Sequence, residues 1–153
     1  MGQKNRVLIF LSGILGACLM LGNAAWGLEF RSIAANATIM YDAPSLKARR
    51  LFIASQYYPV EVVVSLEHWA KVRDISGDLT WVEKEKLSEK RTVVVNVPLA
   101  DIVQAPDSKS PLVFQAEQRV ALELLEFSTP GWVKVRHRDG QNGFISVSQV
   151  WGI

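Results

Sequence analysis

Beyond its apolar N-terminus, the chain alternates hydrophobic and polar positions with the short period of β-strands. Trp69–Arg73 and Trp132–Arg136 alternate large apolar side chains with basic ones, which is typical of half-buried strands. Residues 60–66 and 120–127 are rich in β-branched residues or leucine, which favour extended structure. Only residues 83–89 suit a short helical turn, and no other segment keeps a helical period. The pattern predicts an all-β fold with almost no helix.

Turn residues separate the predicted strands at short intervals. Ser76-Gly77-Asp78 and Arg138-Asp139-Gly140 each follow a strand segment, and residues of these types favour hairpin turns. Short strands punctuated by turns are typical of small barrels. We therefore expect barrels of five strands, each closed by a short helical turn near Leu87 or Val150.

The chain contains an internal duplication. Two copies of one unit match at an offset of 62 residues and then, after one inserted residue near Pro130, at an offset of 63. The identical pairs are Ala43/Ala105, Pro44/Pro106, Lys47/Lys109, Phe52/Phe114, Ala54/Ala116, Gln56/Gln118, Glu61/Glu123, Trp69/Trp132, Lys71/Lys134, Val72/Val135, Arg73/Arg136 and Gly77/Gly140. A register kept on both sides of a loop insertion indicates a true repeat.

The duplication sets the predicted domain boundaries at residues 28–91 and 92–153. Residues 90–98 are rich in valine and contain no glycine or serine, so they predict the last strand of copy one running straight into copy two. A barrel of about 60 residues is only marginally stable by itself. We therefore expect the two copies to pack against each other.

Residues 1–27 have the regions of a secretory signal peptide. Lys4 and Arg6 precede an uncharged apolar run, and Ala25 and Gly27 place small residues at the cleavage positions. This order predicts cleavage before Leu28 and a mature protein in the periplasm or outside the cell.

Two alternatives for the N-terminus stay open. Leu15-Gly16-Ala17-Cys18 resembles a bacterial lipobox, which would attach lipid to Cys18. The uncharged stretch 7–28 is also just long enough for a retained membrane anchor. Whether residues 1–27 are a cleaved signal peptide, a lipoprotein signal or a retained anchor, the rest of the chain is expected outside the cytoplasm. Contact with the membrane is expected only for the lipoprotein and the anchor.

Composition and charge narrow the function classes. The chain is 49% hydrophobic and 21% charged, which is a folding composition. Its net charge is +2, but without residues 1–27 there are 15 basic and 15 acidic residues. Nucleic-acid binders usually keep a basic excess, so no nucleic-acid partner is expected. Cys18 is the single cysteine, and His68 and His137 have no metal-ligand spacing, so neither a metal nor a cofactor is expected.

Both copies contain an Ala-Pro loop, a strand, a Trp-x-Lys-Val-Arg segment, a glycine turn and an aromatic residue before Val or Ile. The pattern is clearest over residues 131–145 and recurs over 69–82. It resembles the bacterial SH3-like (SH3b) family over almost all of residues 37–153. The resemblance implies two small SH3-like barrels in tandem. It also implies a binding module, because SH3b domains mostly bind ligands that range from cell-wall peptides to other proteins.

The resemblance also implies a ligand groove in copy one. A tryptophan opening the strand equivalent to Trp69 and Trp132 lies on the ligand surface of eukaryotic SH3 domains, although both residues could equally be core. Residues 39–42 resemble the ALYD motif, whose tyrosine lines that groove. The predicted ligand-binding residues are Tyr41, Trp69 and Trp81 with a rim of Lys47, Arg49 and Arg50, and their second-copy equivalents are Trp132 and Phe144. The basic rim predicts an acidic ligand, and Phe52 and Phe114 are expected in the cores.

The sequence departs from the eukaryotic groove at several points. The loop over residues 45–50 is basic where many SH3 domains are acidic, and Glu83 and Leu87 replace the groove's proline and second tyrosine. These replacements argue against a proline-rich ligand.

No catalytic motif is recognisable, so no catalytic residue is predicted. The favoured function is an exported, non-catalytic binding module of the bacterial cell envelope that recognises a peptide, peptidoglycan or a partner protein. One alternative is a structural or accessory scaffold without a ligand groove, and another is an unrecognised envelope hydrolase. The sequence leaves the oligomeric state open.

Overall fold

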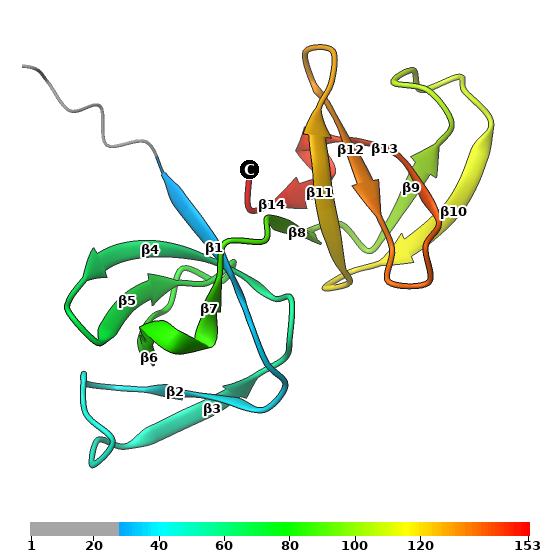
Figure 1. Ribbon diagram of the computed structural model, residues 1–153. Helices are drawn as coiled ribbons and strands as arrows, with labels where there is room; N and C mark the ends of the chain where they lie inside the picture. Colours follow the sequence, from blue (N-terminus) through cyan, green and yellow to red (C-terminus); the bar gives the residue numbers. More distant parts are fainter. Residues whose placement is uncertain (1–27) are drawn as a thin grey trace, which may run out of the picture.

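The computed structural model describes residues 28–153 (Figure 1), so the predicted signal peptide and Cys18 lie outside the described residues. Two antiparallel sheets follow one another along this part of the chain. Repeat one (residues 29–88) contains β1 (Glu29–Ile33), β2 (Thr38–Tyr41), β3 (Arg50–Ala54), β4 (Pro59–Ser65), β5 (Trp69–Arg73), β6 (Leu79–Glu83) and β7 (Leu87–Ser88). Repeat two (residues 92–151) contains β8 (Thr92–Val95), β9 (Leu99–Val103), β10 (Leu112–Glu117), β11 (Ala121–Phe127), β12 (Trp132–Arg136), β13 (Asn142–Ser146) and β14 (Val150–Trp151).

The two sheets have the same topology. Their strand orders are β3-β2-β6-β5-β4-β1-β7 and β10-β9-β13-β12-β11-β8-β14, so each strand of repeat two has a counterpart in repeat one. The predicted all-β fold with two tandem barrels is confirmed. The sheets have seven strands and not the expected five, because the segment before each matched unit forms a strand and a two-residue strand follows each helical turn.

Helical structure in the described residues is limited to two short 3-10 helices. They span Lys84–Lys86 and Val147–Gln149 and directly precede β7 and β14. The expectation of almost no helix is therefore confirmed for residues 28–153. Within the same part of the chain, no helix is both long and apolar enough to cross a membrane.

The valine run of β8 belongs to repeat two. It pairs with β11, where Val94 faces Ala121, and with β14, where Val95 faces Val150. The prediction that this run is the last strand of copy one is wrong. All four residues of β8 are buried, and an apolar run of this kind fits the core of either barrel equally well, so its pattern alone cannot identify its sheet.

Each barrel has its own core. Repeat one buries Ile33, Met40, Ala54, Val60, Ala70, Val72 and Val82, and repeat two buries a larger set that includes Ile102, Leu122 and Ile145. Phe114 packs partly against the second core, but Phe52 is 43% exposed, so its predicted core position is wrong. β3 is an edge strand, and only its last residue, Ala54, is buried. The alternation of apolar and polar residues along a strand does not show whether that strand lies at the edge of its sheet.

The two repeats pack against each other at a joint between β1 and β14. The Phe30 and Trp151 rings meet edge to face with centroids 5.2 Å apart. The Arg91 guanidinium lies 5.6 Å from the Phe30 ring centroid, and its Nη2 donates to the Gly152 carbonyl oxygen at 3.0 Å. Gly152 has a φ of 112°, and a Cβ there would lie 3.1 Å from the Pro59 Cβ of repeat one. The close approach indicates that the repeats form a packed joint.

Candidate functional site

Trp69 is the half-buried aromatic residue at the start of β5. Its ring meets the Tyr41 ring edge to face, with centroids 5.4 Å apart. Tyr41 is only 3% exposed because it lies on β2 inside the sheet, where its Cα pairs with that of Trp81. Tyr41 was predicted to lie on the groove surface, but the structure buries it against Trp69. Tyr41 therefore supports the Trp69 ring from inside the barrel.

A pocket of about 480 Å³ opens beside Trp69. Leu46 lines it from the loop between β2 and β3, and Glu67 and His68 line it from the turn before β5. The remaining wall is formed by Glu83 and the start of the following 3-10 helix, residues 84–85. The pocket thus lies between the loop that carries Lys47 and Arg49 and the turn before β5.

The charge of this pocket differs from the expected basic rim. Lys47, Arg49 and Arg50 are exposed, but none of them lines the pocket, and the Arg49 guanidinium lies 3.3 Å from the Asp42 carboxylate. The lining contains three glutamates, with Lys84 and His68 as its basic side chains. The expected rim placement is therefore wrong, because the loop that carries these cations contributes only Leu46 to the wall.

The three glutamates have different neighbours. Glu85 pairs with Lys86 at 3.0 Å, and the hydrogen bond and charge of Glu85 raise the pKa of the Lys86 ammonium. Glu67 lies 3.6 Å from His68. Glu83 makes no side-chain hydrogen bond or ion pair with any residue in 28–153, and Lys84 donates to the Leu66 carbonyl oxygen at 3.0 Å. Glu83, whose charge adds to that of Glu85 in raising the pKa of Lys86, is therefore the carboxylate of this pocket that has no hydrogen bond or ion pair within residues 28–153.

Trp81 and its counterpart Phe144 occupy matching places away from this pocket. Both rings are half-buried, and each has a lysine ammonium from the neighbouring strand near its face. Lys71 Nζ lies 5.9 Å from the Trp81 ring centroid, and Lys134 Nζ lies 5.7 Å from that of Phe144. Neither aromatic residue touches the pocket beside Trp69.

Repeat two has different chemistry at the matching surface. Trp132 is half-buried like Trp69, but Val103 stands where repeat one has Tyr41. The residues that correspond to the glutamates are all neutral: Pro130, Ser146 and Ser148. Of the two repeats, only repeat one combines a tryptophan packed against a buried tyrosine with nearby carboxylates.

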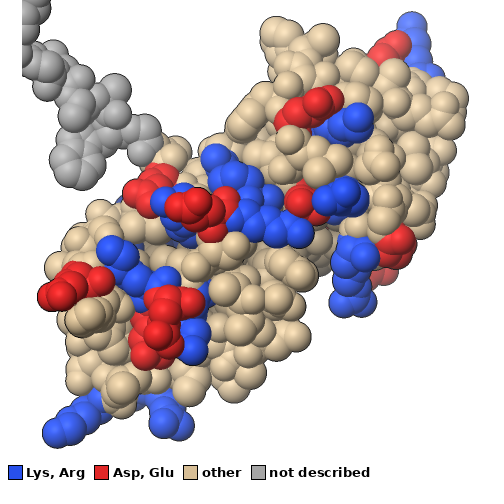
Figure 2. Space-filling view, in the orientation of Figure 1, with Lys and Arg blue, Asp and Glu red and all other residues tan. Residues whose placement is uncertain are grey.

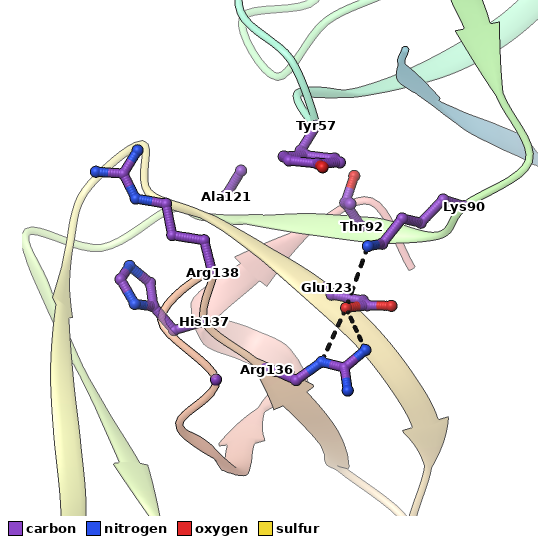
Figure 3. Close-up of a pocket in the computed structure, with 9 residues that line it drawn as sticks. Tyr57, Lys90, Thr92, Ala121, Glu123, Arg136, His137 and Arg138 are labelled. Carbon is purple, nitrogen blue, oxygen red and sulfur yellow. Dashed lines mark hydrogen bonds and ion pairs between the residues drawn. The ribbon is translucent and has the colours of Figure 1, made fainter. Parts of the chain in front are cut away.

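A second pocket, of about 290 Å³, lies at the joint of the repeats (Figure 3). Tyr57 comes from repeat one and Lys90 from the connection, and the other lining residues come from repeat two: Thr92, Ala121, Glu123, Arg136, His137, Arg138 and Gly140. Figure 2 shows basic and acidic side chains side by side along the joint. Sequence reasoning missed this pocket because its walls are distant in the chain, although the Arg136-His137-Arg138 run was a visible signal.

Glu123 joins the two basic groups of this pocket. Its Oε2 accepts from Arg136 Nη2 at 2.8 Å and lies 3.3 Å from Lys90 Nζ. Burial alone would raise the pKa of Glu123, but the hydrogen bonds and charges of Arg136 and Lys90 outweigh it and hold the pKa below its ordinary value of 4.5. The ionised carboxylate therefore holds the connection between the repeats against repeat two.

The stability of the protein is expected to depend on the ionisation of Glu123. Because its pKa is lower in the folded state, its contribution is present above about pH 4.5 and is lost as the pH falls through the lower folded value. We expect Glu123→Gln to remove this part of the pH dependence, measured by urea unfolding between pH 3 and 7. Glu126→Gln is the control, because the Glu126 carboxylate lies 3.9 Å from Lys134 in a more exposed pair. Equal pH profiles for wild type and Glu123→Gln would contradict the prediction.

The Bacterial SH3 domain family model matches the chain twice, at residues 34–89 and 96–152. No curated protein matches significantly. Among the described residues, no group of three or more His, Cys, Asp and Glu side chains is placed to hold a metal ion.

Solved structures to which the chain is similar include NlpC2 and NlpC1 from Trichomonas vaginalis, each 19% identical, with TM-scores of 0.36 and 0.35. The matches cover 82% and 90% of this chain and 48% and 50% of those two chains. An NlpC/P60 family protein from Bacillus cereus is 16% identical with a TM-score of 0.34, over 80% of this chain and 56% of that one. The chain thus spans about half the length of these structures.

Proposed function

Because the chain belongs to the bacterial SH3 domain family, we propose that it is an exported, non-catalytic binding module of the bacterial cell envelope. In this proposal repeat one recognises a peptide, peptidoglycan or a partner protein through the pocket beside Trp69. The non-catalytic part of the proposal rests on the usual role of such domains. The envelope location rests on the signal-like order of residues 1–27.

The observation that carries the proposal is the pairing of Trp69 with an acidic pocket. A half-buried tryptophan offers a large apolar contact area for little lost side-chain entropy. Glu83 faces the same pocket with no partner among the described residues, and Glu67 and Glu85 add negative charge. An ammonium or guanidinium group would gain from the tryptophan face and from the carboxylates. We therefore propose a ligand that carries a basic group at this point.

A structural or accessory role is the second candidate. The packed joint of Phe30, Arg91 and Trp151 supports it, because a rigid double barrel would suit a scaffold that contacts partners over its outer surface. In that case the pocket beside Trp69 would have no ligand. Substitution of its tryptophan would then leave partner binding unchanged.

The test compares Trp69→Ala with Trp132→Ala in pull-downs on purified cell-wall sacculi and on envelope extract. Loss of an aromatic anchor is expected to cost about 2 kcal/mol of binding, a roughly thirtyfold weakening. We expect this loss for Trp69→Ala and a much smaller one for Trp132→Ala, whose surroundings are neutral.

Binding by Glu83→Gln and the melting temperatures of all three variants complete the test. Glu83→Gln should also weaken binding while leaving the melting temperature near that of the wild type, because the Glu83 carboxylate makes no hydrogen bond or ion pair within residues 28–153. A large and equal drop in melting temperature for both tryptophan variants would instead identify both as core residues. Unchanged binding by stable Trp69→Ala would favour the scaffold.

A further inference from the structure

The pocket at the joint carries an excess of positive charge. Its lining contains one lysine and two arginines, Lys90, Arg136 and Arg138, and Glu123 is its single carboxylate. His137 also lines it, and its Nδ1 lies 3.0 Å from the Asp139 carboxylate just outside. Lys90 and Arg136 share Glu123, so the lining keeps more positive than negative charge after its internal pairs are formed.

Arg138 is the cation of this pocket that has no internal partner. Its guanidinium makes no hydrogen bond or ion pair with any residue between 28 and 153, whereas Lys90 and Arg136 both contact Glu123. In Figure 3 the Arg138 side chain lies on the side opposite Lys90, and its guanidinium points away from the group formed by Lys90, Glu123 and Arg136. A guanidinium in this position can donate two parallel hydrogen bonds to an oxyanion.

A buried hydroxyl faces the same space. Thr92 is 2% exposed, and its Oγ1 has no hydrogen-bond partner in the described part of the chain. Thr92 lines the pocket, and in Figure 3 its hydroxyl points toward Tyr57. A buried hydroxyl is normally hydrogen-bonded, so an unpaired one on a pocket wall indicates a place for a ligand atom.

Tyr57 forms the apolar side of the pocket. Its ring is partly exposed and lies 5.0 Å from Lys90 Nζ. The backbone of Tyr57 has a φ of 69°, and its counterpart Arg119 has 71°, so this conformation belongs to the repeated turn. The tyrosine itself occurs only in repeat one. It places an aromatic face beside the cations, and Ala121 lies on the same lining.

We propose that the joint pocket binds a small oxyanion that is attached to an apolar group. Arg138 would bind the oxyanion, Tyr57 would pack against the apolar group, and the Thr92 hydroxyl would bond another oxygen of the ligand. Lys90 and Arg136 would add only longer-range attraction for the anion, because both pair with Glu123. The site is separate from the pocket beside Trp69 and takes a ligand of opposite charge. Because its walls come from both repeats, neither repeat forms it alone.

The test is an NMR titration of the isotope-labelled chain at low ionic strength with N-acetyl-alanyl-alanine, its C-terminal amide, and inorganic phosphate. We expect the free acid to shift the amide signals of Thr92 and Gly140 but not that of Trp69, and the amide to bind at least tenfold more weakly. If inorganic phosphate gives saturable shifts and N-acetyl-alanyl-alanine does not, the oxyanion site is supported and phosphate is its ligand. No saturable shift at the joint with either anion would overturn the proposal.

Two variants separate binding from folding. Arg138→Ala is expected to weaken anion binding at least fivefold, whereas Lys109→Ala, which removes one charge outside the pocket, should leave it unchanged. Thr92→Val should weaken binding while keeping or raising the melting temperature, because it removes an unpaired buried hydroxyl. A stable Thr92→Val chain and a stable Arg138→Ala chain that both bind like the wild type would contradict the proposal.

Discussion

Phe30→Ala is expected to lower the free energy of unfolding by about 3–5 kcal/mol. Phe30 is 5% exposed, and its ring lies edge to face with the Trp151 ring and close to the Arg91 guanidinium. Removing the ring would leave a cavity at the point where β1 of one repeat meets β14 of the other. We therefore expect the loss of stability to be accompanied by loss of coupling between the repeats.

Calorimetry would measure both parts of this result. The wild type should unfold in one transition, and Phe30→Ala should unfold in two, because each barrel has a separate core. Phe127→Ala is the matched control, since Phe127 is 62% exposed and should cost little. A single transition with a loss under about 1 kcal/mol would show that the ring does not couple the repeats.

Gly143→Thr is expected to destabilise the protein by about 3 kcal/mol, although threonine is the residue at the same place in repeat one. A Cβ at Gly143 would lie 2.7 Å from both the Val103 carbonyl oxygen and Ile102 Cγ2. Here β13 approaches β9 too closely for a side chain. The corresponding Thr80 is 4% exposed and is accommodated in repeat one.

Urea unfolding of Gly143→Thr and Gly143→Ala would check this result. The control is Asn142→Thr, an exposed position on the same strand. Both Gly143 variants should unfold at lower urea than the control. A Gly143→Thr chain as stable as the wild type would contradict the prediction, because it would show that both barrels accept threonine at this position.

The sequence predicted the repeated fold because periodicity and self-similarity are local signals. Trp69–Arg73 and Trp132–Arg136 alternate as half-buried strands do, and each occupies the same place in its sheet. The assignment of β8 to copy one was wrong because a run of four buried residues does not indicate which of the two sheets the strand joins. The predicted core position of Phe52 was wrong for a related reason. Whether a strand lies at the edge of a sheet depends on which strands pair with it, and the strand's own pattern of residues does not show this.

The candidate site was predictable in position but not in charge. Similarity to SH3 domains pointed to Trp69 and to the loop after Tyr41, and a pocket lies between that loop and the turn before β5. Which side chains of the loop face the pocket depends on its folded path, and only Leu46 does so. The ligand-binding role of Trp69 and of the other named residues stays a prediction.

Within residues 28–153, each sheet is built from one continuous stretch of chain, and no strand crosses from one repeat to the other. A chain made in order from its N-terminus is therefore expected to finish its first barrel before the second has appeared, as domains commonly fold as units. Trp151, on the last strand of repeat two, would then reach Phe30 after the first barrel has formed. The joint, and the pocket that both repeats line, would assemble only after both barrels, so a chain stalled within repeat two would expose the Phe30 ring to chaperones and proteases.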